Sequence, residues 1–179
     1  MGLQNTAGKV TYLNMKQGKF ARKNANGDIE LYDSVEGIIK AVEFKDDEYN
    51  GTSFRKISIT LVDGDEKYIL QIRTDSGYYR GLTNSIANGD ITKPVKLVAS
   101  SKEVNGKPQT TIFVSQGGQA LKWKWTKDNP GNLPPLETVK LKGRTVYDNT
   151  QQQAFFEGYW TTLLNTAVQI GDSADDLPF

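Results

Sequence analysis

The chain has 179 residues, of which 37% are hydrophobic and 24% charged, so its length and composition fit one globular domain with short extensions. It contains no cysteine and no histidine, which excludes disulfides, zinc–thiolate sites and mechanisms that need a thiolate nucleophile or an imidazole base. With a net charge of +1, no apolar run of about 18 residues and no secretory signal, we expect a cytoplasmic binding protein without enzymatic activity or cofactor.

Strand-like runs separated by turn residues occupy the first 145 residues and predict a mostly β protein. Three short runs begin the chain, at residues 9–15, 18–22 and 29–32. The dipeptide Gln17-Gly18 separates the first two runs, as expected for a tight turn between neighbouring strands. We therefore expect an N-terminal β-meander over residues 1–33.

The middle of the chain, residues 34–127, has a different order of elements. Strands are expected at residues 35–45, 54–62, 67–73, 94–100, 109–115 and 120–126, with a polar loop at 46–52. Residues 76–88 lack alternation, and their apolar side chains recur every three or four positions, which predicts one short helix. Three strands, a helix and two or more strands resemble the order of an OB-fold, a five-stranded Greek-key barrel with a helix between its third and fourth strands. We expect residues 34–127 to form such a barrel.

The C-terminal part, residues 128–171, begins with a connector rich in proline, glycine and asparagine. One strand-like run follows at residues 138–141, and Asp148 or Asn149 is placed to cap a helix over residues 150–167. An apolar stripe runs along this helix: Phe156, Tyr159, Trp160, Leu163 and Ala167. The stripe favours packing against the barrel, and a homodimer or partner surface is the alternative.

The last segment, residues 172–179, is acidic and ends in an aromatic residue that carries the free carboxylate. Without its three aspartates the chain has 22 basic and 18 acidic residues, a net charge of +4. A partner protein could bury Phe179 in an apolar pocket and meet the aspartates with basic residues. The partner-binding residues we expect are Asp172, Asp175, Asp176, Leu177, Pro178 and Phe179.

The final five residues, Asp-Asp-Leu-Pro-Phe, resemble the end of bacterial single-stranded DNA-binding proteins, whose tails bind helicases, nucleases and polymerase subunits. The order of meander, barrel, helix and acidic tail also looks like that of single-stranded DNA-binding proteins of phages and prophages. The cellular bacterial family begins directly with its barrel and has a long Gly/Gln/Pro-rich linker, neither of which occurs here. Its tetramer is therefore not implied.

This resemblance implies a protein that coats single-stranded DNA (ssDNA) with little sequence specificity during replication, recombination or repair. The tail would recruit partner enzymes. The alternative is an adaptor on an OB-like scaffold that binds no DNA. A carboxylate-dependent nuclease is a third interpretation. The acidic segments 46–48 and 63–66 lack the spacing of a calcium loop, and no third carboxylate or catalytic lysine is placed by motif beside Asp63 and Asp65, so we expect no metal.

Aromatic side chains that stack on bases, and cations that contact phosphates, are what sequence-tolerant ssDNA binding requires. Such residues lie on and after the predicted second and third strands, in the loop between the fourth and fifth strands, and in a basic–aromatic cluster. They are Phe54, Arg55, Lys56, Tyr68, Arg73, Tyr78, Tyr79, Arg80, Lys102, Lys107, Lys122, Trp123, Lys124 and Trp125.

Two groups among these residues have a second interpretation. In a strand, Trp123 and Trp125 would share one face and the flanking lysines the other, so the tryptophans could be core residues instead of base-stacking ones. Tyr68 shares its face with Leu70 and Ile72, and burial in the core is again the alternative. Both interpretations stay open at the level of sequence.

Overall fold

The computed structural model describes residues 10–175, with side chains for residues 10–164. The protein is mostly β with two helices. The strands are β1 (Val10–Lys16), β2 (Lys19–Lys23), β3 (Ile29–Tyr32), β4 (Ser34–Tyr49), β5 (Thr52–Asp63), β6 (Glu66–Arg73), β7 (Val95–Val104), β8 (Lys107–Gln116), β9 (Gln119–Ala120), β10 (Glu137–Leu141) and β11 (Arg144–Asp148). The helices are α1 (Gly77–Ile86) and α2 (Thr150–Asp175).

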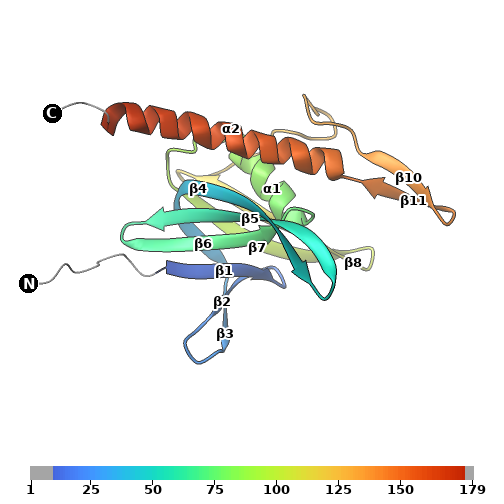
Figure 1. Cartoon of the computed structure of the whole chain (residues 1–179), viewed down its shortest axis with the longest axis horizontal. Coiled ribbons are helices and arrows are strands. Elements are labelled where there is room, and N and C mark those ends of the chain that lie inside the picture. Colours follow the sequence, from blue (N-terminus) through green and yellow to red (C-terminus); the bar gives the residue numbers. More distant parts are fainter. Residues whose placement is uncertain (1–9, 176–179) are drawn as a thin grey trace, which may run out of the picture.

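The described strands β1 to β9 form one open mixed sheet in the order β3-β2-β1-β6-β5-β4-β7-β8-β9 (Figure 1). The expected meander is present, because β2 pairs antiparallel with both β1 and β3. We expected a barrel, but within residues 10–175 no closed barrel forms. The reason is that β1 pairs in parallel with β6, from Val10 opposite Lys67 to Asn14 opposite Gln71. The outer edge of β6 is therefore taken by the meander.

The hairpin of β4 and β5 corrects the predicted polar loop at residues 46–52. The two strands stay paired to Tyr49 opposite Thr52, so the loop is only Asn50-Gly51. Both turn residues have positive φ, 50° and 78°, which is the type I′ geometry that matches the twist of a hairpin. The hairpin is consequently a long two-stranded arm, and the acidic residues 46–48 lie on a strand.

The core lies between the sheet and the helices, where β5 contributes the buried residues Ile57, Ile59 and Leu61. The short helix expected over residues 76–88 is confirmed as α1, which Ser76 caps by accepting the Tyr79 backbone N–H. α1 lies very close to β8. A Cβ added at Gly81 would stand 2.0 Å from Oγ1 of Thr111, so only glycine permits this approach.

Helix α2 lies over α1 (Figure 1) and contacts β4 of the sheet. It begins where Asp148 accepts the Thr150 N–H, at 2.9 Å, and continues beyond the expected residue 167 to Asp175. Phe156 and Trp160 are buried, and Nε1 of Trp160 donates a hydrogen bond to the Thr83 hydroxyl at 2.9 Å. Packing of the apolar stripe on the rest of the molecule is thereby confirmed for its described residues, while Ala167 lies beyond the described side chains.

The strand predicted for residues 120–126 is wrong, because β9 ends at Ala120. The following backbone turns to α1: the N–H groups of Lys124 and Trp125 donate to the main-chain and side-chain oxygens of Asn84, at 3.1 and 3.0 Å. These hydrogen bonds to α1 take the place of the backbone pairing that a strand at residues 121–126 would have made. The run predicted at 138–141 is present as β10, and its partner β11 was not predicted.

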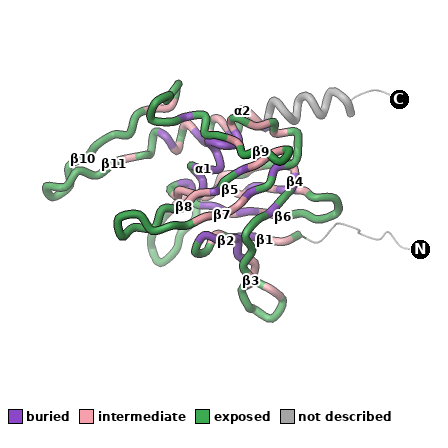
Figure 2. Tube along the Cα trace, turned by 180° about the vertical axis from the view of Figure 1, so that it is seen from behind, coloured by how far each residue is buried: buried purple, intermediate pink, exposed green. Residues whose placement is uncertain are grey.

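Figure 2 shows how burial is distributed over these elements. Buried residues follow the inner side of the sheet and the facing sides of the two helices, whereas β10 and β11 are exposed almost throughout. No helix within residues 10–175 is both long and apolar enough to cross a membrane.

Candidate nucleic-acid interface

The outer face of the sheet is formed by the side chains that alternate with the core residues. On β5 this face carries Phe54 and Lys56, and Lys56 stands opposite Arg73 of β6 in the strand register. The parallel neighbour β1 adds Asn14, which stands opposite Gln71. Residues that are distant in sequence thus line up side by side across three strands.

A concavity of about 400 Å³ lies on these strands, and we call it the sheet groove. It lies where β1, the β4–β5 arm, β6 and the start of α1 meet. The lining residues are Asn14, Met15, Asp47, Phe54, Lys56, Gln71, Ile72, Arg73, Ser76 and Tyr78. The groove brings together four of the residues predicted to contact ssDNA: Phe54, Lys56, Arg73 and Tyr78.

An aromatic ring and a guanidinium are stacked in the groove. The Arg73 guanidinium lies 4.5 Å from the centroid of the Phe54 ring, and it also donates two hydrogen bonds to Asp75, at 3.0 and 2.7 Å. These bonds raise the pKa of Arg73, so it stays a cation. The Phe54 ring and the Arg73 guanidinium thus place a hydrophobic and a cationic surface side by side in the groove.

The second cation of the groove is paired as well. Nζ of Lys56 lies 2.8 Å from Oδ2 of Asp47, one strand away. The hydrogen bond from Lys56 lowers the pKa of Asp47, so this carboxylate remains ionised. Lys56 is partly buried and Asp47 is exposed. An ion pair that is open to solvent on one side is worth about 1 kcal/mol, so a phosphate can take the place of the carboxylate at small cost.

Tyr78 closes one end of the groove and is largely buried. Its hydroxyl accepts the backbone N–H of Gly18 at 2.9 Å, which ties the β1–β2 turn to α1. Gly18 has φ of +76° and lies against Ser101 of β7, where a Cβ would stand 2.8 Å away. Tyr78 is therefore a wall of the groove and also a link between the meander and the rest of the protein.

Other predicted contacts lie elsewhere. Arg55, on the opposite face of β5, donates to both carboxylate oxygens of Glu157 in α2, at 2.9 and 2.5 Å, and to Asp46 at 2.9 Å. Tyr79 is 1% exposed, edge-on to Phe44 and Phe156, and burial raises its pKa. The structure thus places Tyr79 in the core and uses Arg55 to fasten α2 to the sheet.

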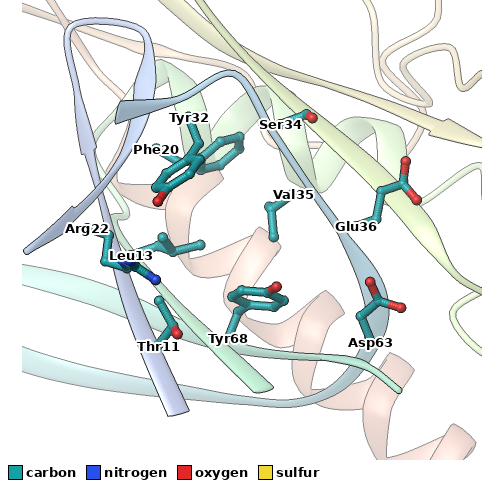
Figure 3. Close-up of a pocket in the computed structure, with 10 residues that line it drawn as sticks. All are labelled: Thr11, Leu13, Phe20, Arg22, Tyr32, Ser34, Val35, Glu36, Asp63 and Tyr68. Carbon is teal, nitrogen blue, oxygen red and sulfur yellow. The ribbon is translucent and has the colours of Figure 1, made fainter. Parts of the chain in front are cut away.

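Tyr68 lies in a separate cavity of about 200 Å³ between β1, β2, β6 and the start of β4 (Figure 3). Its hydroxyl donates to Glu66, and this bond raises the pKa of Tyr68 to about 12. The cavity is lined by Thr11, Leu13, Phe20, Arg22, Tyr32, Ser34, Val35, Glu36, Asp63 and Tyr68. None of these residues lines the sheet groove, so Tyr68 is apart from the four residues gathered there.

The basic–aromatic cluster divides into an inner and an outer part because residues 121–126 do not form a strand. Trp125 is buried among Phe155, Phe156 and Tyr159 of α2, whereas Trp123 is 37% exposed. Nζ of Lys124 lies over the rings of Trp125 and Tyr159, at 5.5 and 5.6 Å. Only Lys122, Trp123 and Lys124 remain at the surface.

Three more predicted cations are exposed: Arg80 on α1, and Lys102 and Lys107 on the β7–β8 hairpin. The turns of β4–β5 and β7–β8 project from the same end of the molecule (Figure 1).

Two residues of the groove, Asn14 and Met15, were not predicted from the sequence. The alternation of β1 indicated a strand, but nothing in its residues indicated that β6 is its neighbour.

The predicted tail lies mostly outside what can be described. Asp172 and Asp175 belong to the last part of α2, without described side chains, and Asp176, Leu177, Pro178 and Phe179 lie outside the described residues. Within residues 10–164, acidic side chains do not gather into a group of three that could hold a metal ion.

Comparisons with known protein families, with characterised proteins and with solved structures found no match.

Proposed function

We propose that the protein binds ssDNA along the sheet groove, with no chemistry of its own, and recruits replication or recombination enzymes through residues 172–179. The observation that carries this proposal is the convergence of Phe54, Arg73 and Lys56 in one open concavity. A ring beside two cations suits a flexible polyanion with stacking bases. Such a protein would act in the cytoplasm of a bacterial or phage-infected cell.

The connectivity supports the proposal. β4, β5, β6, α1, β7 and β8 follow one another in the order of an OB-fold, and β4 pairs with both β5 and β7, as the first strand of that fold does. The face of the second and third OB strands is the usual site for oligonucleotides. Here these strands would be β5 and β6, which carry the groove, and the meander would be an addition along β6.

The charges of the groove also agree with reversible, sequence-tolerant binding. Lys56 and Arg73 are held by exposed carboxylates that a phosphate can replace. Each phosphate neutralised on a single strand contributes about 0.7 to the slope of log affinity against log salt. About five contacts would therefore give a slope of about 3 to 4.

The tail supports the second half of the proposal by its resemblance to bacterial and phage ssDNA-binding proteins. It contains three aspartates and no base, and its last residue is Phe179. An acidic peptide that ends in an aromatic carboxylate suits a basic-rimmed apolar pocket on a partner protein.

Fluorescence anisotropy of a labelled oligo-dT tests the DNA-binding proposal. The full chain should bind with a salt slope of about 3 to 4, and Phe54→Ala should weaken binding roughly tenfold, because base stacking is worth about 1 to 3 kcal/mol. Phe113→Ala is the matched control, since Phe113 is an aromatic residue of β8 that is 57% exposed and does not line the groove.

Two outcomes would count against the proposal. Absence of binding by the full chain at low salt would leave the adaptor interpretation. Equal losses for Phe54→Ala and Phe113→Ala would move the DNA site away from the groove.

A variant that ends at Gly171 should keep its DNA affinity or gain some, because the residues removed carry three of the acidic groups.

A further inference from the structure

The hairpin of β10 and β11 is set apart from the rest of the protein. It forms its own two-stranded sheet, and every residue from Glu137 to Tyr147 is exposed. Figure 1 shows it projecting beyond the first turn of α2. An isolated two-stranded hairpin is marginal in water, since it has no core of its own. Its side chains therefore contribute little to the fold of the remaining chain.

The charges of the hairpin are separated along its length. Its two acids, Glu137 and Asp148, form the rung farthest from the turn, and both are engaged by α2: Glu137 accepts from Gln151 at 2.6 Å, and Asp148 accepts from Thr150. The cations Lys140, Lys142 and Arg144 lie toward the turn. Among the described side chains, none pairs with them. The outer part of the hairpin therefore carries a net charge of +3.

The strand register places an aromatic ring near these cations. Thr138 stands opposite Tyr147, and Lys140 stands opposite Thr145, so Tyr147 and Lys140 are diagonal neighbours on one face. Tyr147 is 67% exposed. This face offers a planar ring and an ammonium group as diagonal neighbours, whereas the sheet groove combines a ring with a guanidinium.

The position of the hairpin in the molecule is also relevant to DNA binding. In Figures 1 and 2 it projects from the same end as the β4–β5 and β7–β8 turns. Phe54 and Lys56 of the groove lie on β5 close to the first of these turns. The groove and the hairpin therefore both present cations toward this end of the molecule.

We propose that the β10–β11 hairpin is a second ssDNA-binding element, in which Tyr147 stacks on a base and Lys140, Lys142 and Arg144 contact phosphates. This inference rests on the proposed function. Charge complementarity favours DNA over a second copy of the chain, because a symmetric contact between two hairpins would bring their three cations together. A single strand supplies negative charge along its whole length.

The experiment compares variants on two oligonucleotides by anisotropy at several salt concentrations. A dT oligomer of about 8 nucleotides fills one OB-type site, whereas one of about 30 extends beyond it. The triple variant K140A/K142A/R144A should lower the salt slope by about 2 on the long oligomer. Tyr147→Ala should weaken binding of the long oligomer roughly tenfold. Binding of the short oligomer should stay the same for both variants.

A matched control removes the same charge elsewhere. K23A/K40A/K96A takes three exposed lysines from β2, β4 and β7, none of which lines the groove. The control should leave the slope close to that of the unmodified chain. Unchanged thermal unfolding would confirm that both triple variants are folded.

The failures can be told apart. If Phe54→Ala weakens binding while the hairpin variants behave like the control, the hairpin inference is wrong and the proposed function stands. If the unmodified chain binds neither oligomer, both are wrong. If light scattering shows that the hairpin variants dissociate an oligomer without loss of DNA affinity, the hairpin is a self-association surface and the inference is overturned.

Discussion

The sheet groove and the β10–β11 hairpin combine the same chemical groups in opposite ways. In the groove the ring of Phe54 and the cations Lys56 and Arg73 stand on a sheet backed by a core, and each cation is held by a carboxylate. In the hairpin the cations have no described carboxylate partner, and no core lies behind them. The side chains of the groove are therefore held in position before DNA binds, whereas the cations of the hairpin have no carboxylate to displace.

This difference predicts that the groove and the hairpin affect different rate constants of DNA binding. Preorganised groups lose less entropy when they bind, so the groove should determine how long DNA stays bound. Unpaired cations that project from the surface act over a longer distance and are screened by salt, so the hairpin should mainly affect the rate of association. The following substitutions test the core behind the groove, the independence of the hairpin and the extent of the groove.

The largest effect is expected from Trp160→Ala, which removes the support behind the sheet. Trp160 is 1% exposed and donates to Thr83, so its loss leaves a cavity and an unpaired buried hydroxyl. We expect a loss of about 3 to 5 kcal/mol in the free energy of unfolding, measured by urea denaturation. A loss below about 1 kcal/mol would show that α2 is not part of the core.

Replacement of a glycine by alanine should lower global stability more in the core than in the β10–β11 hairpin. Gly81→Ala puts a Cβ 2.0 Å from Thr111 Oγ1, so overpacking should cost about 1 to 3 kcal/mol of global stability. Gly143, in the hairpin turn, has φ of +77° and open space around it. Gly143→Ala should strain only that turn. Thermal unfolding should therefore shift for Gly81→Ala alone, and an equal shift for both would mean that the hairpin unfolds together with the core.

Releasing a groove cation should tighten DNA binding. Asp47→Asn removes the carboxylate that holds Lys56, and an ion pair of this kind is worth about 1 kcal/mol, so we expect about a two- to fivefold gain in affinity. Asp33→Asn is the matched control, because Asp33 is an exposed partner of Lys19 and does not line the groove. Equal gains for both variants would reveal a general charge effect instead of a groove contact.

The smallest effect on binding is expected for Tyr68→Phe. Tyr68 lies in the cavity of Figure 3, outside the groove, so DNA affinity should not change. The substitution should remove the phenolate absorbance step of a tyrosine with a pKa of about 12. Because this pKa lies above the ordinary value of 10.0, the stabilisation from Tyr68 is present below that pH and is lost as the pH rises toward 12. Weaker DNA binding by this variant would extend the site into the cavity.

Local pattern was sufficient for most elements. Spacing of three and four predicted α1, and alternation predicted β5 and β6. Each of these signals depends on residues a few positions apart. The sequence grouped Phe54, Arg55 and Lys56 together as residues that contact DNA, and only the structure separates Arg55, which binds Glu157 of α2, from Phe54 and Lys56 in the groove.

Other features depended on contacts between elements that alternation and composition do not report. Residues 46–48 are polar and acidic, as in a loop, but cross-strand pairs such as Lys56 with Asp47 keep them in β4. Residues 121–126 alternate as in a strand, but Asn84 of α1 takes their backbone N–H groups. In both segments tertiary contacts outweigh intrinsic preference, which differs among strand residues by only about 1 kcal/mol.

The sequence by itself determined the mostly β class, the two helices and the acidic aromatic-ended tail. Only the tertiary structure decided that β1 lies beside β6 in parallel, which leaves the sheet open and brings Asn14 and Met15 into the groove. Alternation along a strand specifies which face a side chain occupies, but it does not specify the neighbouring strand. That choice depends on the burial and backbone pairing of the whole sheet.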